Sequence, residues 1–335
     1  MKESTKELIK KRLYHFRWFE KYVNMRNVQI ISEKYNMVGG GKIVCLRNKI
    51  YQQGGIGDRL RGMVTTYKFC QDLGLPFKIG HYFPFDLRDY LSPNEVDWSI
   101  DEEDVCMDLR FSKVVAWGSI PAKATGKSGK ETQQWNTSQF KKRIFKASRK
   151  AYQVHVYTNA FLISKGDFSN LFHKLFRPTG TLQHLMQFHD AQIGSSYISV
   201  TTRFQNLLGD FNEGDRYHEL PSEKEKSEYI DKCLNKIAEI HAANEDCKML
   251  VTSDSQRFLK TASALPYVYT ITGDLRHPQS DSHEDKAAYM KSFLDLMMIS
   301  EAQKVFLLVT GRMFRSGFAM IGAAINMKEY HVIEF

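Results

Sequence analysis

Arg203 stands at a position where an arginine could bind a ligand. It follows Tyr197–Val200, a short run of β-branched and aromatic residues that predicts a buried strand. In an open α/β sheet, ligands bind just beyond the carboxyl ends of the strands. An arginine there can present a planar fork of donors to a phosphate group. Pairing with a surface carboxylate is the alternative, so the interpretation depends on the rest of the chain.

Two other predicted strands also end in polar residues. Ser253 and Asp254 follow a predicted strand over 247–252, and the loop 310–316 follows one over 304–309. If the sheet is parallel, both ends lie beside Arg203. Together they supply a cation, a carboxylate, hydroxyls and a helix N-terminus, which suits a nucleoside diphosphate. Asp254 and Ser316 could instead be plain helix caps.

A glycine-rich loop follows the first predicted strand, Lys42–Leu46. It contains Gly54, Gly55 and Gly57 and leads into a predicted helix over 58–73. A strand, a glycine loop and a helix together bring a helix N-terminus and backbone amides to a ligand. The spacing is not GxGxxG, so the dinucleotide fingerprint is not met. A turn that binds nothing is the alternative.

The order of predicted elements indicates an α/β fold. Strands and helices alternate with short loops after residue 196, which is typical of a parallel, doubly wound sheet, and the first half alternates less regularly. A length of 335 residues suits two domains. We predict an N-terminal helix over 1–27 and two Rossmann-like, doubly wound domains, 28–185 and 186–335, which face each other across a cleft.

Composition limits the classes of partner and compartment. The net charge of +9 favours an anionic partner: a nucleotide, a nucleic acid, an acidic glycan or a membrane surface. The five cysteines include no CxxC pair, which argues against zinc and a disulfide framework and favours the cytoplasm. No apolar run predicts a transmembrane helix, and the N-terminus has no secretory signal.

Two basic segments are candidates for contact with an anionic partner. Residues 2–27 have the spacing of a basic amphipathic helix, which either packs on the protein with a solvated basic face or attaches peripherally to the inner face of the membrane. Residues 122–150 predict a mobile loop and then a basic helix, either with a solvated face or in contact with an acceptor or a membrane. Trp135 and Phe140 are too few aromatics to predict nucleic-acid binding.

Several motifs resemble, in order, those of the fucosyltransferase superfamily, which includes α-1,2-, α-1,6- and protein O-fucosyltransferases and rhizobial nodulation enzymes. They are Gly54–Gly62, Val200–Arg203, Leu250–Asp254, and Phe293-Leu-Asp-Leu with Ser316-Gly-Phe and Ala323-Ala324. The resemblance covers about residues 42–326. It implies a GT-B glycosyltransferase whose second domain holds a nucleotide-sugar donor, GDP-fucose. It also implies inversion at the sugar carbon, no cofactor or essential metal, and a glycan or glycolipid acceptor such as a surface polysaccharide.

The resemblance also implies roles for individual residues. Arg203 matches the family's donor-phosphate arginine, which stabilises charge on the leaving β-phosphate. Asp254 matches an aspartate near the guanosine. The other implied donor-binding residues match family positions or flank them: Gly55, Gly57, Asp58, Thr201, Ser253, Arg315, Ser316, Gly317 and Phe318.

The chain departs from the family pattern at several of these positions. Thr201 stands where many members have histidine, and Phe204 and Asn206 stand where many have a second arginine and an acidic residue. Inverting transfer to a hydroxyl requires a base near the acceptor. Our candidates for this base are Asp58, Asp210 and Glu213. The departures leave open a catalytically inactive nucleotide-sugar-binding protein of the same fold, or a transferase that uses another nucleotide sugar.

Overall fold

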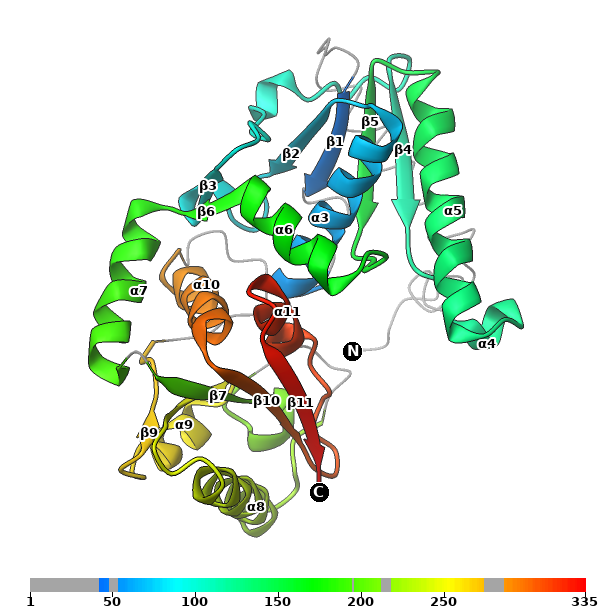
Figure 1. Cartoon of the computed structure of the whole chain (residues 1–335). Helices are drawn as coiled ribbons and strands as arrows, with labels where there is room; N and C mark the ends of the chain where they lie inside the picture. The colour runs from blue at the N-terminus through cyan, green and yellow to red at the C-terminus, as the bar shows by residue number, and fades with distance from the viewer. Residues whose placement is uncertain (1–41, 48–53, 195, 212–217, 274–285) are drawn as a thin grey trace, which may run out of the picture. The chain divides into compact units, whose positions relative to one another are not determined.

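A computed structural model describes residues 42–47, 54–194, 196–211, 218–273 and 286–335 (Figure 1). The chain divides into two compact units that are not contiguous in sequence. Among the described residues, the first unit contains 42–47, 65–83 and 97–162, and the second contains the rest, including 54–64 and 84–96. Both units are built on parallel sheets, which confirms the predicted α/β fold. The predicted helix over residues 2–27 lies outside the described residues.

The first unit has a four-stranded parallel sheet in the order β2-β1-β5-β4. Its strands are β1 (Lys42–Arg47), β2 (Phe77–His81), β4 (Ser112–Trp117) and β5 (Gln153–Thr158). Helix α5 (Gly129–Ser148) packs on β4 and β5, and the ring of Phe140 stacks on that of Trp117 with centroids 5.4 Å apart. The remaining helices of this region are α3 (Ile56–Leu73), α4 (Ala122–Thr125) and the 3₁₀ turn η2 (Glu102–Asp104).

Local sequence patterns in the first half of the chain also predict a strand over 105–109 and a short helix over 84–91, and neither forms as predicted. Residues 105–109 form no strand, because the Cys106 amide donates to the side chain of Gln153 while Val105 packs in an apolar cluster. The segment 122–150, predicted as a mobile loop and then a basic helix, begins with the short helix α4, which Gly126 ends in a left-handed conformation, and then contains the predicted basic helix, α5. Residues 84–91 contain only the 3₁₀ turn η1 (Leu87–Asp89), followed by the short strand β3 (Leu91–Pro93).

The second unit has a five-stranded parallel sheet in the order β11-β10-β7-β8-β9. Its strands are β7 (Tyr197–Thr202), β8 (Lys248–Ser253), β9 (Val268–Tyr269), β10 (Lys304–Val309) and β11 (Glu329–Glu334), and β3 pairs separately with β6 (Phe176–Pro178). Its helices are α6 (Lys165–Leu175), α7 (Gly180–Ile193), α8 (Glu223–Ala242), α9 (Gln256–Ala262), α10 (Lys286–Glu301) and α11 (Phe318–Ile325), with the 3₁₀ turn η3 (Gln205–Leu208).

Strand β7 lies in the middle of the second sheet, and all six of its residues are buried. Ile198 and Val200 pack in a cluster with apolar side chains of α8 and α9. On α10, the carbonyl of Met298 accepts a hydrogen bond from the hydroxyl of Tyr197 at 2.6 Å. Figure 1 shows α8 and α9 on one side of this sheet and α10 and α11 on the other. Helices therefore cover both faces, which is the predicted doubly wound arrangement.

Candidate functional site

The carboxyl ends of β10, β7 and β8 lie side by side, as the sequence predicted for a parallel sheet. Thr202 is in register with Leu308 of β10 on one side and with Ser253 of β8 on the other. Beyond the strands, the Phe314 amide donates to the carbonyl of Arg203 at 3.0 Å. The loop after β10 is thereby bonded to the loop after β7, and both follow strand ends at the edge where α/β proteins bind ligands.

A buried carboxylate holds the loop that carries Arg203. Asp254 accepts hydrogen bonds from the amides of Phe204 at 2.9 Å and Gln205 at 2.7 Å, and its Oδ2 lies 3.3 Å from Arg203 Nε. Its side chain is only 1% exposed. Burial raises the pKa of this carboxyl, and the Arg203 charge and the two amides oppose that rise. The geometry therefore makes Asp254 a residue that positions Arg203, because a contact with a ribose or a base would require these bonds to break.

The turn after Arg203 is conformationally unusual. Gln205 has a φ of 54°, which few residues other than glycine adopt. The hydrogen bond from its amide to Asp254 helps to hold that conformation. Gln205 Nε2 and Thr202 Oγ1 are buried and have no hydrogen-bond partner among the described residues. Unusual backbone and unsatisfied polar atoms cluster at binding sites in proteins, so this turn is a natural place for a ligand.

Helix α3 begins within the same unit as these strand ends. A Cβ at Gly57 would lie 3.3 Å from Ile321 on α11, so glycine allows the two helices to approach closely. Asp58 forms an ion pair with Arg61 at 2.7 Å. A Cβ at Gly317 would lie 3.7 Å from Arg61 Nη1, which places that guanidinium at the N-terminus of α11. Our sequence reasoning singled out Gly57, Asp58 and Gly317 but overlooked Arg61, although its i,i+3 spacing from Asp58 was a usable signal.

The loop before α11 contributes several of the predicted donor-binding residues. The Ser316 hydroxyl accepts from the Phe318 amide at 3.2 Å, so this serine caps the start of the helix. Gly317 is the N-cap residue and has no capping side chain, which leaves backbone amides at this end of α11. Arg315 is 64% exposed and pairs with Glu334 at the end of β11. A cap at Ser316 is the alternative that the sequence left open, and it does not exclude a ligand at the neighbouring amides.

Two of the predicted donor-binding residues have buried hydroxyls that bond within the sheet. Thr201 Oγ1 lies 2.9 Å from Thr252 Oγ1 on the neighbouring strand. Ser253 Oγ accepts from the Ser255 amide at 3.2 Å. The Thr201 hydroxyl thus joins the ends of two neighbouring strands, and the Ser253 hydroxyl joins a strand end to the turn that follows it. In this structure the Thr201 side chain therefore bonds within the sheet.

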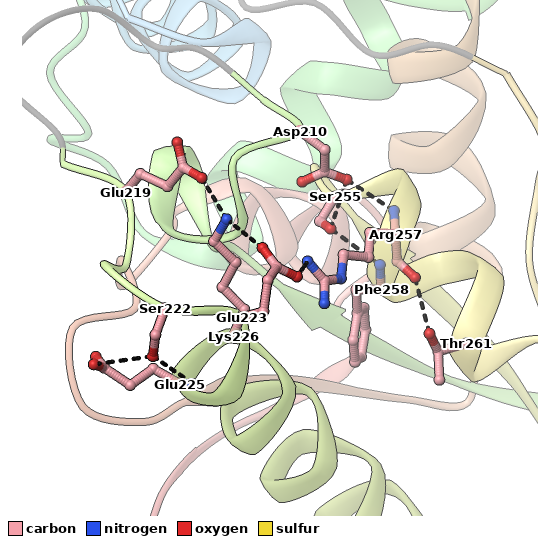
Figure 2. Close-up of polar contacts among 10 residues, drawn as sticks. All are labelled: Asp210, Glu219, Ser222, Glu223, Glu225, Lys226, Ser255, Arg257, Phe258 and Thr261. Atoms are coloured by element: carbon pink, nitrogen blue, oxygen red, sulfur yellow. Dashed lines mark hydrogen bonds and ion pairs between the residues drawn. The ribbon is translucent and has the colours of Figure 1, made fainter.

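The candidate base Asp210 belongs to a polar network around the start of α9 (Figure 2). Its Oδ2 accepts from the Ser255 hydroxyl at 2.9 Å and from the Arg257 amide at 2.8 Å. Arg257 in turn pairs with Glu223 at 2.7 Å, and Glu223 pairs with Lys226 at 2.8 Å. Asp210 is therefore engaged as a second cap of α9. The candidate base Glu213 lies outside the described residues.

In the part of the chain that the structure describes, no group of three or more His, Cys, Asp or Glu side chains could hold a metal ion. None of the helices described is both long and apolar enough to cross a membrane.

Two α/β units with parallel sheets and polar residues at the strand ends are typical of proteins that bind a ligand at the edge of a sheet. Comparison with solved structures identifies the fold more closely. No family model and no curated protein sequence matches the chain. Fucosyltransferase NodZ from Bradyrhizobium is similar with a TM-score of 0.53 at 12% identity, over 89% of this chain and 96% of that one. The same TM-score is obtained for NodZ α-1,6-fucosyltransferase co-crystallised with GDP.

Two further fucosyltransferase structures are also similar. A mutant of Arabidopsis thaliana FUT1 in complex with GDP has a TM-score of 0.54 at 10% identity, over 94% of this chain and 77% of that one. POFUT1 in complex with GDP has a TM-score of 0.52 at 13% identity, over 89% and 99%. At this identity the likeness establishes a shared fold. The chain therefore has the GT-B fold of the fucosyltransferases, which confirms the fold that the motif resemblance implied.

Proposed function

We propose that the protein is a glycosyltransferase that transfers fucose from GDP-fucose to a hydroxyl of a glycan or glycolipid, such as a surface polysaccharide. The observation that carries this proposal is Arg203, held at the carboxyl end of β7 by the buried Asp254. Solved structures with the same fold contain GDP or GDP-fucose. An arginine at this edge of the sheet suits a diphosphate leaving group.

Arg203 would act by stabilising negative charge that develops on the β-phosphate as the sugar departs. Its Nε lies 3.3 Å from Asp254 and its Cζ lies 4.9 Å from the centre of the Phe211 ring, so the guanidinium is held on two sides. A preorganised cation needs little rearrangement at the moment of reaction, and its loss costs about 3 kcal/mol of transition-state stabilisation.

We also propose that the reaction inverts the sugar carbon, as the motif resemblance implies, and that it needs no metal. Arg61 lies at the N-terminus of α11, where the helix dipole and backbone amides also favour an anion. Two arginines and a helix end could together neutralise a diphosphate without a divalent cation. For the acceptor base we favour Asp58 among the described candidates, because its ion-pair partner Arg61 lies at the N-terminus of α11, where we place the diphosphate.

We also propose where in the cell the protein works. A transferase that uses a cytoplasmic nucleotide sugar and a glycolipid acceptor would work in the cytoplasm at the inner face of the membrane. The basic segment 1–27 is a proposed peripheral contact there.

Calorimetry tests the donor assignment first. The purified chain is titrated in EDTA with GDP, GDP-fucose, GDP-mannose and UDP-glucose, and GDP release from GDP-fucose is then measured over a panel of glycan acceptors. We expect guanine-nucleotide binding that persists in EDTA and prefers fucose. Arg203→Ala should lower turnover at least a hundredfold. Arg177→Ala, which removes an exposed arginine on β6 of the same unit, serves as the matched control.

The possible outcomes separate the alternatives. Donor binding without transfer or donor hydrolysis would indicate a catalytically inactive nucleotide-sugar-binding protein. Preference for another nucleotide sugar would keep the enzyme class and change the donor. No binding of any guanine nucleotide would mean that the chain shares the fold without the donor. Turnover unchanged in Arg203→Ala would refute the role given to that residue.

A further inference from the structure

The positive charge of the chain is concentrated in one part of the first unit. Residues 109–162 contain eleven Lys or Arg residues and a single acidic residue, Glu131, although the whole chain carries a net charge of only +9. Most of these cations lie on α5 or close to its ends. Glu131 is engaged in the capping box at the first turn of α5. Position 145 lies 14 residues further along the helix, which is about 21 Å away.

Some of these cations have partners within the first unit. Arg143 lies over the ring of Trp117, with 4.8 Å between Cζ and the ring centre. Lys141 forms an ion pair with Asp72 and lies 5.0 Å from the ring centre of Phe69. These contacts account for the basic residues on the two flanks of α5. The outer face of the helix has a different set of residues.

That outer face combines cations with exposed aromatic rings. Lys142, Phe145, Lys146 and Arg149 are all exposed, and their spacing by three and four places them on one side of the helix. Phe145 is 44% exposed, and the Arg149 guanidinium lies 5.8 Å from its ring centre. Tyr152, just beyond the helix, is 54% exposed. We call these five residues the basic aromatic face.

Among the residues that the structure describes, no acidic side chain neutralises the cations of the basic aromatic face. In the described part of the chain, no carboxylate forms an ion pair with Lys142, Lys146 or Arg149. Figure 1 shows α5 along β4 at the edge of the sheet, with its C-terminal end beside the starts of β4 and β5. The face is therefore formed by the outer side of an edge helix together with the turn that leads into β5.

An anionic lipid surface fits this combination better than a polyanionic chain does. Lys and Arg near a membrane gain from the negative potential of its lipids, and aromatic side chains favour the level of the headgroups. The outer side of a single helix is convex, whereas proteins that bind single-stranded nucleic acid track it along a positively charged groove. Phenylalanine also offers no hydrogen bond to a glycan, but it can bury its exposed surface among lipid chains.

We propose that the basic aromatic face docks the first unit onto a bilayer that contains anionic lipids. Lys142, Lys146 and Arg149 would lie at the phosphate level, while Phe145 and Tyr152 would enter the headgroup region. This interaction is independent of the donor bound by the second unit. It is also distinct from the contact suggested for residues 1–27, because it needs only residues of α5 and the turn after it.

Sedimentation of the full-length chain with vesicles tests the proposal. Vesicles of phosphatidylcholine with 30% phosphatidylglycerol are compared with pure phosphatidylcholine at about 0.1 M salt, where screening still permits surface attraction. We expect binding to the anionic vesicles only. The variant Lys142→Glu, Lys146→Glu, Arg149→Glu should reduce the partition coefficient at least a hundredfold, since each cation near such a surface contributes about fivefold.

A matched variant separates a local effect from net charge. Lys224→Glu, Lys232→Glu, Lys260→Glu makes the same change of charge at exposed positions of the second unit, and it should keep most of the binding. Phe145→Ala with Tyr152→Ala should weaken vesicle binding about tenfold and leave retention on heparin, used as a polyanion probe, unchanged. Urea unfolding confirms that each variant is folded.

Three results would overturn the proposal. The first is the absence of binding to anionic vesicles by the unaltered chain. The second is an equal loss in the two charge-reversal variants, which would indicate an effect of net charge alone. The third is tight binding to heparin together with vesicle binding that the aromatic substitutions leave unchanged, which would identify the face as a polyanion site.

Discussion

Replacing Asp254 with asparagine tests whether this residue positions Arg203 or contacts a ligand. The carboxylate accepts from two backbone amides, at 2.9 and 2.7 Å, in a site where its side chain is 1% exposed. Asparagine has one acceptor oxygen, so its NH₂ group would face the second amide and leave a buried donor unpaired. An unpaired buried donor costs about 1–3 kcal/mol, and the loss of charge assistance adds roughly 1 kcal/mol. We expect Asp254→Asn to lower the free energy of unfolding by about 2–4 kcal/mol.

The effect on ligand binding is measured with a double-mutant cycle. GDP affinity is determined by calorimetry for the unaltered chain, Asp254→Asn, Arg203→Ala and the double variant. If Asp254 acts only through Arg203, the asparagine variant should bind GDP about tenfold to a hundredfold more weakly. In the Arg203→Ala background, the same substitution should cause little further loss. The coupling free energy would then be about 1.4–2.8 kcal/mol.

Two results would refute this reasoning. Additive losses of GDP affinity would mean that Asp254 contacts the ligand independently of Arg203, as the family resemblance first suggested. A free energy of unfolding within about 0.5 kcal/mol of the unaltered chain would mean that the two amide hydrogen bonds do not hold the loop. Urea unfolding of each variant at 25 °C supplies the second measurement.

Two further predictions concern stability. A Cβ at Gly322 would lie 2.5 Å from Ile299 Cγ2, so Gly322→Ala should destabilise the packing of α11 on α10 by about 2 kcal/mol in urea unfolding. In an Ile299→Ala background, which lacks the clashing methyl group, the same substitution should cost less than it does in the unaltered chain. Burial lowers the pKa of His155 from 6.5 to about 4. Between these pH values the unfolded chain binds one more proton than the folded chain does, so the free energy of unfolding should fall as the pH drops through this window. The total loss should be roughly 3 kcal/mol. His155→Leu should reduce the slope of unfolding free energy against pH in that range, and an unchanged slope would contradict the assignment to His155.

Much of the second unit could be predicted from local sequence patterns. The strands that became β7, β8 and β10 are apolar runs that end in polar residues, so both their positions and their convergence beside Arg203 followed from periodicity and the parallel-sheet rule. Short and weakly patterned elements were less predictable. Strand β9 pairs over only Val268 and Tyr269, although residues 267–272 are rich enough in β-branched and aromatic side chains to predict a longer strand.

The sequence by itself determined the fold class, the alternation of strands and helices in the second unit and the group of polar residues at the strand ends, because these depend on neighbours within a few positions. Only the tertiary structure decided what each side chain contacts. Asp254 faces the Arg203 loop, Thr201 bonds to Thr252, and Arg61 reaches the start of α11. Each of these contacts joins residues about 50 or more positions apart, so it depends on how strands and helices pack and not on any local pattern.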